Sequence, residues 1–353
     1  MTKEVIKQTE ERSSERKETQ LEEECSMKNW KKAIALIASM SALVSMAACG
    51  SANGASGGNG GKKVVGFVAV GAEGGFRTAN ENDIQTAFKD AGFDLRYSPT
   101  TQSDQQKQIQ AFNKFVNDEV DAIILSSTED SGWDDSLKKA AEAEIPVFTV
   151  DRDVDVQDAA AKKAIVSHIG PSNEWCGQQA AEFLNKQFPD GGNGLILEGI
   201  AGLSVVKDRQ TGFDEKIASN QKVLESQSAN WSTDEAKTVT AGLLDKYKSQ
   251  GVNWIWAQND EMALGAAQAV DAAGLKGKVT IIGNDGTKAA LQAVADGELA
   301  FDIEYNPIFG KETAQAVQDY LDGKDVEPNI EIESKTFTKE EAQAALDSGE
   351  RQY

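Results

Sequence analysis

The sequence predicts an α/β protein in which two parallel sheets form two lobes. Short runs rich in Val, Ile, Phe and Trp alternate with segments whose apolar residues recur at helical spacing, and this alternation is typical of right-handed βαβ units. About ten such runs occur, which divide more naturally between two sheets than into one. About 290 of the 353 residues follow the N-terminal segments, enough for two hydrophobic cores.

The first 26 residues are strongly charged and have almost no apolar spacing, so we expect a disordered extension or an upstream mis-start of translation. Residues 27–48 resemble a bacterial lipoprotein signal peptide, because lysines precede an apolar stretch that ends in two alanines and Cys49. A short core helix is the alternative, but this stretch lacks a polar face. Cys49 is therefore the expected site of lipidation, and residues 49–61, rich in Gly and Ser, form a flexible tether.

The predicted strands lie in chain order along the folded part. They are residues 64–70, a run around Leu95, and residues 122–125, 147–150, 165–169, 195–197, 223–224, 254–256, 279–282 and 301–303. Amphipathic segments separate them, for example one with Ile84 and Phe88 on one face and another with Phe112 and Val116. Because the pattern restarts near residue 165, we expect the boundary between the lobes near residues 167–171.

Composition excludes several classes of function. The formal charge is −21 and the isoelectric point is about 4.5, so nucleic acid is not an expected partner. Three cysteines are present, and with Cys25 upstream and Cys49 lipidated, Cys176 has no disulfide partner in the mature chain. With His168 as the single histidine, neither a metal site nor a cofactor is expected. The glycines of residues 71–75 do not fit the dinucleotide-binding fingerprint.

Polar side chains follow several predicted strands at the point where each strand ends. Asp151-Arg152 follows one strand, residues 71–77 follow another, and residues 257–261 and 283–286 follow two more. Ligands of open α/β sheets bind beyond the carboxyl ends of the strands. Carboxylates, amides and arginines can satisfy neighbouring hydroxyls, while an aromatic ring such as that of Trp231 can pack against the C–H face of a sugar. An exposed ion pair is the alternative interpretation of Asp151-Arg152.

Five ordered motifs carry a resemblance to a known family. VFTVDR, GIAGLSVVKDR, AQNDEMALGA and GNDGT resemble those of type I periplasmic sugar-binding proteins of the ribose-binding kind. VGAEGGFR resembles the subgroup that takes hexoses in furanose form, and with the signal included the chain is most similar to fructose-import lipoproteins of actinobacterial ABC transporters. The resemblance covers nearly the whole chain from Lys62 onward.

The resemblance implies two Rossmann-like lobes joined by three hinge crossovers that close on the sugar. Residues 62–168 with 307–328 would form the N-terminal lobe, and residues 169–306 with 329–353 the C-terminal lobe. The crossovers would fall near His168, near residues 305–307 and near residues 328–330. His168 would then be a hydrogen-bonded hinge residue rather than a base.

The resemblance also implies the residues that contact the sugar. Phe76 and Trp231 would lie against its faces. The hydroxyls would be bound by Asp151, Arg152, Arg209, Asn259 and Asp285, with Glu73 and Arg77 added in the furanose subgroup. Near the second crossover, where the family often has a glutamine, the further candidate is Glu304 or Tyr305. The other tryptophans, at positions 133, 175, 254 and 256, are expected in the core or at interfaces, and Asp260 and Glu261 are explained as acids at a helix N-terminus.

A substrate-binding lipoprotein of an ABC sugar importer is the predicted function, with fructose as the ligand. The expected partners are the permease and the ATPase of the importer. We expect a monomer that is anchored by lipid on the extracellular face of the cell membrane. A sugar-sensing receptor for galactofuranose, ribose or another monosaccharide is the alternative. Sugar-responsive repressors with this fold carry a helix-turn-helix where this chain has an export signal. No enzymatic activity is expected, although a glycosidase would need only two suitably spaced carboxyl groups.

Overall fold

The structure is a computed structural model that describes residues 61–101, 104–349, 351 and 353. The predicted extension, the signal peptide, most of the tether and Cys49 lie outside these residues. Within them, no helix has both the length and the apolar character needed to cross a membrane.

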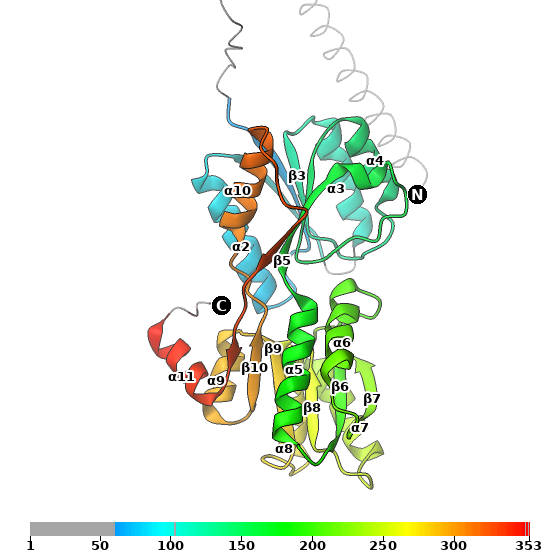
Figure 1. Ribbon diagram of the computed structural model, residues 1–353, viewed down its shortest axis with the longest axis vertical. Helices are drawn as coiled ribbons and strands as arrows, with labels where there is room; N and C mark the ends of the chain where they lie inside the picture. Colours follow the sequence, from blue (N-terminus) through cyan, green and yellow to red (C-terminus); the bar gives the residue numbers. More distant parts are fainter. Residues whose placement is uncertain (1–60, 102–103, 350, 352) are drawn as a thin grey trace, which may run out of the picture. The chain divides into compact units, whose positions relative to one another are not determined.

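The first sheet has six strands in the order β11-β5-β4-β3-β1-β2, all parallel (Figure 1). The strands are β1 (Val64–Ala69), β2 (Asp94–Pro99), β3 (Ala122–Leu125), β4 (Val147–Val150), β5 (Ile165–Pro171) and β11 (Asn329–Ile332). Next to the edge strand β2, Val65 of β1 is in register with Leu95 on one side and with Ala122 of β3 on the other.

Helices cover both faces of this sheet, as expected for parallel strands. They are α2 (Gly75–Asp90), α3 (Gln105–Asn117), α4 (Asp134–Glu142), the 3₁₀ turn η2 (Ala161–Ala164) and α10 (Gly310–Leu321). Side chains alternate along β1, so Phe67 packs with Ile84 of α2 and Val317 of α10, whereas Val68 packs with Phe112 of α3. The lobe therefore has two hydrophobic layers around one sheet.

The second sheet repeats this arrangement in the order β12-β10-β9-β8-β6-β7, with only β12 antiparallel. The strands are β6 (Gly192–Glu198), β7 (Gln221–Ser228), β8 (Trp254–Ala257), β9 (Thr280–Asp285), β10 (Phe301–Glu304) and β12 (Thr336–Phe337). The helices are α5 (Asn173–Gln187), α6 (Ser204–Lys216), α7 (Thr233–Lys246), α8 (Asp260–Ala272), α9 (Lys288–Asp296) and α11 (Lys339–Ser348).

Polar residues at the helix starts explain where several of these helices begin. In α5, α7, α8 and α9 the side chain of the N-cap residue accepts a hydrogen bond from a backbone N–H of the first turn. These N-cap residues are Ser172, Ser232, Asn259 and Thr287. Thr338 and Glu341 form a complete capping box at α11. Asn259 and Thr287 follow β8 and β9 closely, so these two caps also fix the loops at the carboxyl ends of the second sheet.

The fold class predicted from the sequence is confirmed, with two α/β lobes of mostly parallel strands. All ten predicted strand runs overlap a strand of the structure. Trp133, Trp254 and Trp256 are fully buried, as expected for core residues.

The boundaries between the lobes differ from the prediction at two of the three crossovers. Residues 169–171 continue β5 in the first sheet, and residues 329–332 form β11, which pairs with β5 in that same sheet. The chain therefore returns to the second lobe only after residue 332, where β12 pairs with β10. The prediction missed this strand because NIEI is short, polar at alternate positions and at the edge of the sheet.

Candidate functional site

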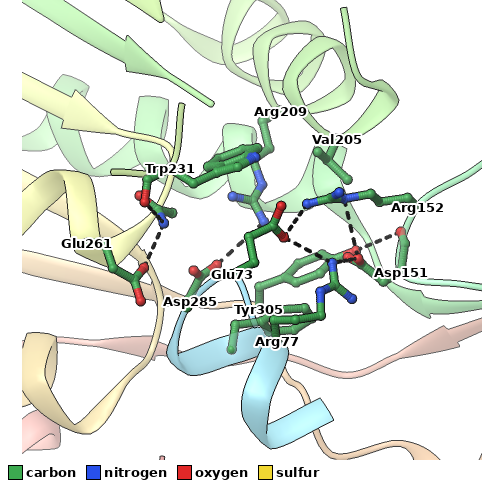
Figure 2. A pocket seen from close by; sticks show the side chains of 13 residues that line it. Glu73, Arg77, Asp151, Arg152, Val205, Arg209, Trp231, Glu261, Asp285 and Tyr305 are labelled. Atoms are coloured by element: carbon green, nitrogen blue, oxygen red, sulfur yellow. Dashed lines mark hydrogen bonds and ion pairs between the residues drawn. The ribbon is translucent and has the colours of Figure 1, made fainter. Parts of the chain in front are cut away.

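A small cavity lies where the carboxyl ends of the two sheets face each other (Figure 2). Both lobes and the second crossover contribute to its lining, which consists of Glu73, Gly74, Phe76, Arg77, Asp151, Arg152, Val205, Arg209, Trp231, Asn259, Glu261, Asp285 and Tyr305. Nine of the ten residues predicted to contact a sugar are therefore brought together.

Glu304 is the predicted residue that does not line the cavity. Its Oε2 accepts the backbone N–H of Lys335 at 2.8 Å, and its other oxygen pairs with Arg351. Because side chains alternate along a strand, Glu304 and the next residue, Tyr305, point to opposite sides. Tyr305 lines the cavity. Glu304 instead binds Lys335 in the third crossover and pairs with Arg351.

On the N-terminal lobe, two carboxylates and two guanidiniums form a buried network. Asp151 pairs with Arg77 through a short contact, and its Oδ2 lies 3.7 Å from Nε of Arg152. Glu73 pairs with Arg152 and lies 3.5 Å from the guanidinium of Arg77. Each of these four side chains is less than one-tenth exposed, so the charges satisfy one another away from water.

The arginines keep both carboxylates ionised. Burial alone would raise the pKa of Asp151, but Arg77 and Arg152 outweigh it and hold the pKa below its usual value. The pKa of Glu73 is lowered in the same way, against burial, by Arg152 and Arg77. The network therefore offers carboxylate acceptors and guanidinium donors at neutral pH.

On the C-terminal lobe, Arg209 is the central cation. Its Nε donates to Oδ1 of Asn173 at 2.9 Å, and its guanidinium lies 3.6 Å from a carboxylate oxygen of Asp285. The same guanidinium lies over the rings of Tyr305 and Trp231, at 4.8 and 5.8 Å from their centroids. Arg209 thus joins the polar and aromatic parts of the site.

Three aromatic rings bound the cavity. Phe76 and Tyr305 are in tilted contact, with ring centroids 5.1 Å apart, and Trp231 lies on the second lobe. Gly199 lets the indole of Trp231 pass close to the backbone, since a Cβ there would lie 1.9 Å from the ring. Rings at these positions supply apolar faces beside the charged groups.

The sequence interpretation missed a role for Glu261. It does lie in the first turn of α8, as predicted, but its side chain lines the cavity. Its Oε1 accepts the backbone N–H of Gly75 from the other lobe at 2.8 Å, and its Oε2 accepts from Nδ2 of Asn259 at 2.7 Å. The position of Glu261 soon after the end of β8 could have indicated a role in the site. The favourable interaction of an acid with the helix N-terminus, however, already explained the residue.

Tyr305 joins the second crossover to both lobes. Its hydroxyl donates to the backbone oxygen of Asp151 at 3.2 Å and accepts from Nδ2 of Asn173 at 3.1 Å. The sequence indicated only that Tyr305 or Glu304 had a role here. The hydrogen bonds place Tyr305 at the hinge side of the cavity.

Backbone strain is concentrated at the site. Asp151, Trp231 and Asp285 have φ values of 65°, 61° and 135°, where L residues are uncommon. Such conformations persist when surrounding structure fixes them, and they cluster at ligand sites. Asp151 and Trp231 follow β4 and β7, Asp285 is the last residue of β9, and all three line the cavity.

Further contacts join the lobes beside the cavity. Ser204 Oγ donates to Asp130 Oδ1 at 3.2 Å, and the ammonium of Lys207 lies 3.8 Å from the same carboxylate. The cavity measures about 40 Å³. A cavity of about 150 Å³ accepts benzene, so lobes or side chains must move apart to admit anything as large as a sugar.

The described residues contain no cluster of three or more His, Cys, Asp or Glu side chains arranged to hold a metal ion. His168 Nδ1 lies 3.0 Å from the hydroxyl of Thr149, within the first sheet. Cys176 is buried and free, and burial raises the pKa of its thiol to about 12.

Two α/β lobes with three crossovers, and a buried polar and aromatic site between them, define a binding protein that encloses a small polar solute. The family model for the periplasmic binding protein domain matches residues 65–325. The chain belongs to this family, and its fold is that of the type I members.

The chain is also similar to individual sugar-binding proteins of this family. The chain is 79% identical over 327 residues to the fructose import binding protein FruE of Bifidobacterium longum (strain NCC 2705), covering 93% of this chain and all of that protein. Two solved structures have TM-scores of 0.77. The arabinose-transporter binding protein of Shewanella sp. ANA-3, bound to L-arabinofuranose, is 33% identical over 81% of this chain and 95% of that one. A Mycobacterium smegmatis protein in complex with β-D-fucofuranose is 32% identical over 82% and 95%.

Proposed function

We propose that the protein is the substrate-binding subunit of an ABC sugar importer and that it binds fructose in a furanose form. The observation that carries the proposal is the cavity itself, which combines ionised carboxylates, guanidiniums and three aromatic rings. Hydroxyl groups both donate and accept, so this mixture suits a neutral sugar. The name of the relative at 79% identity supports fructose, and the solved neighbours support a furanose ring.

The geometry supports a role for each residue of the cavity. Asp151 accepts hydrogen bonds from sugar hydroxyls, while Arg152 donates to the sugar and stays paired with the carboxylates. Phe76 and Trp231 pack against the C–H faces of the ring. Arg209, Asn259 and Asp285 bind from the second lobe, and Glu261 and Tyr305 complete the enclosure.

We further propose that the protein acts at the cell surface and performs no chemistry. Cys49 carries the lipid anchor on the extracellular face of the membrane, and a permease and an ATPase complete the importer. Two acyl chains hold a protein at a membrane where one would not. The mature protein is a monomer, and incubation with saccharides should yield no hydrolysis product.

Titration calorimetry against a panel of fructose, ribose, arabinose, galactose and glucose tests the ligand. We expect fructose to bind most tightly. Preference for ribose or for galactose would support the alternative of a receptor for another monosaccharide. No binding to any sugar of the panel would refute the proposed function.

A further inference from the structure

Two buried carboxyl groups face each other beneath the site without a cation between them. Asp260 on α8 and Asp302 on β10 are both fully buried, and both carboxyl groups lie beside Gly283. A Cβ at Gly283 would lie 2.7 Å from Oδ1 of Asp260 and 3.0 Å from Oδ2 of Asp302. The absent side chain at Gly283 therefore leaves a space that both oxygens border.

The pair requires a proton. Oδ1 of Asp260 and Oδ2 of Asp302 have no N–H or O–H donor among the described residues. Two carboxylates in one buried place cannot both ionise, and one carboxylic acid that donates to its neighbour removes the conflict. The nearest cation, Arg209, is directed to Asp285 and to the backbone oxygen of Gln258.

The other two oxygens of the pair hold the loop after β9. Asp260 Oδ2 accepts the backbone N–H of Thr287 at 2.7 Å, and Asp302 Oδ1 accepts that of Gly286 at 3.2 Å. This loop begins at Asp285, whose backbone is strained and whose side chain lines the cavity. The pair thus fixes the backbone that presents Asp285.

We propose that Asp302 is a positioning residue which shares one proton with Asp260, and that this proton-sharing pair fixes loop 285–287 so that Asp285 faces the sugar. The part that concerns sugar rests on the proposed function, whereas the shared proton is a property of the protein alone. Neutral Asp302 donates to Asp260 and still accepts from Gly286. Loss of the proton would place two like charges in contact and loosen the loop.

Among the titratable groups around the pair Arg209 is a cation, but its guanidinium is directed to Asp285 and to Gln258. The titratable groups that act on the pair or on Asp285 are Asp285 on β9, Glu261 on α8, Arg209 on α6, Cys176 on α5, and Tyr353 near the C-terminus. Burial, then Asp260 and Asp285, raise the pKa of Asp302 well above its usual value. Arg209 acts against this shift at Asp260 and Asp285 but does not reverse it.

The sign of the pH dependence follows. With a raised pKa, Asp302 holds its proton in the folded protein where the unfolded chain has lost it. Its contribution to stability is complete below the ordinary carboxyl pKa of 3.8 and declines as the pH rises toward the folded pKa. Across that window the unfolding equilibrium constant rises by up to about tenfold per pH unit.

Asp302→Asn is the decisive variant, because its amide donates to Asp260 without a titratable proton and its oxygen still accepts from Gly286. Denaturant unfolding of wild type and variant is compared between about pH 5 and pH 9. We expect the wild type to lose stability relative to the variant as the pH rises. Infrared spectra of the wild type near neutral pH should show a protonated carboxylic acid band that the variant lacks.

Sugar affinity gives the second readout. Fructose affinity of Asp302→Asn should stay within about threefold of wild type, whereas Asp302→Ala should lose about tenfold, since a buried carboxylate and a buried N–H lose their partners. If Asp302→Ala does not fold, Asp302→Asn still decides. Identical pH profiles with the same infrared band would overturn the shared proton, and unchanged affinity in a folded Asp302→Ala would overturn the positioning role. Absence of fructose binding in the wild type would instead contradict the proposed function, while the unfolding and infrared results would stand.

Discussion

Asp151→Asn removes the carboxylate that lies between two buried guanidiniums while keeping the size of the side chain. Asn is the suitable replacement because Asp151 has a φ of 65°, which Asn tolerates better than Ala does. The variant keeps one acceptor oxygen but loses the ion pairs to Arg77 and Arg152.

The expected losses of fructose affinity and of folding stability depend on the contacts that the variant keeps. A hydrogen bond to a charged group contributes about 1.5–3 kcal/mol, so fructose affinity should fall by about 10- to 150-fold. Breaking a buried pair can cost about 3–5 kcal/mol of folding stability. Glu73 still contacts both arginines, so we expect a loss nearer about 2 kcal/mol.

Titration calorimetry measures the affinity, and urea unfolding measures the stability. Asp118→Asn is the matched control, because this carboxylate pairs with Lys114 and Arg96 at the surface, outside the cavity. The control should change neither quantity measurably. Wild-type affinity in a folded Asp151→Asn would refute the assignment of this carboxylate to the sugar.

Three further outcomes follow from the structure. Glu261→Ala removes the acceptor of the Gly75 N–H and of Asn259, so calorimetry should show about a tenfold loss of fructose affinity; an unchanged affinity would return Glu261 to a helix-start role alone. Saturating fructose should make the particle more compact by small-angle scattering, because the site is divided between the lobes; the same profile at confirmed saturation would indicate that the lobes are already closed. Cys49→Ser should release the protein from the membrane or leave its signal uncleaved, and a processed, membrane-bound variant would exclude the lipid anchor.

Periodicity and strand endings were enough to predict most of the fold. Apolar runs such as VFTV and WIWA are fully buried strands, and their ends carry Asp151 and Asn259. The resemblance then selected nine residues that share one cavity. These residues share a cavity because parallel strands place their carboxyl ends at a common edge, and their contacts with a sugar stay a prediction.

Features that depend on the direction of a side chain could not be predicted from the amino-acid sequence. Glu304 and Tyr305 are neighbours in sequence, and the pleat alone decides which one lines the cavity. Glu261 had a sufficient local explanation, although its partner, Gly75, lies 186 residues away. The shared proton of Asp260 and Asp302 needs the meeting of α8 and β10, which no local pattern reports.

The pairing of every arginine in the cavity with a carboxyl group has a consequence for what the importer rejects. Four carboxyl groups and three guanidiniums line the cavity, and the arginines are already paired with carboxylates. A phosphorylated sugar would bring up to two negative charges into this enclosure, against carboxylates and without an unpaired arginine to receive them. The receptor would therefore distinguish a free sugar from its phosphate ester by charge, so that phosphorylated sugars in the surroundings do not compete for the transporter.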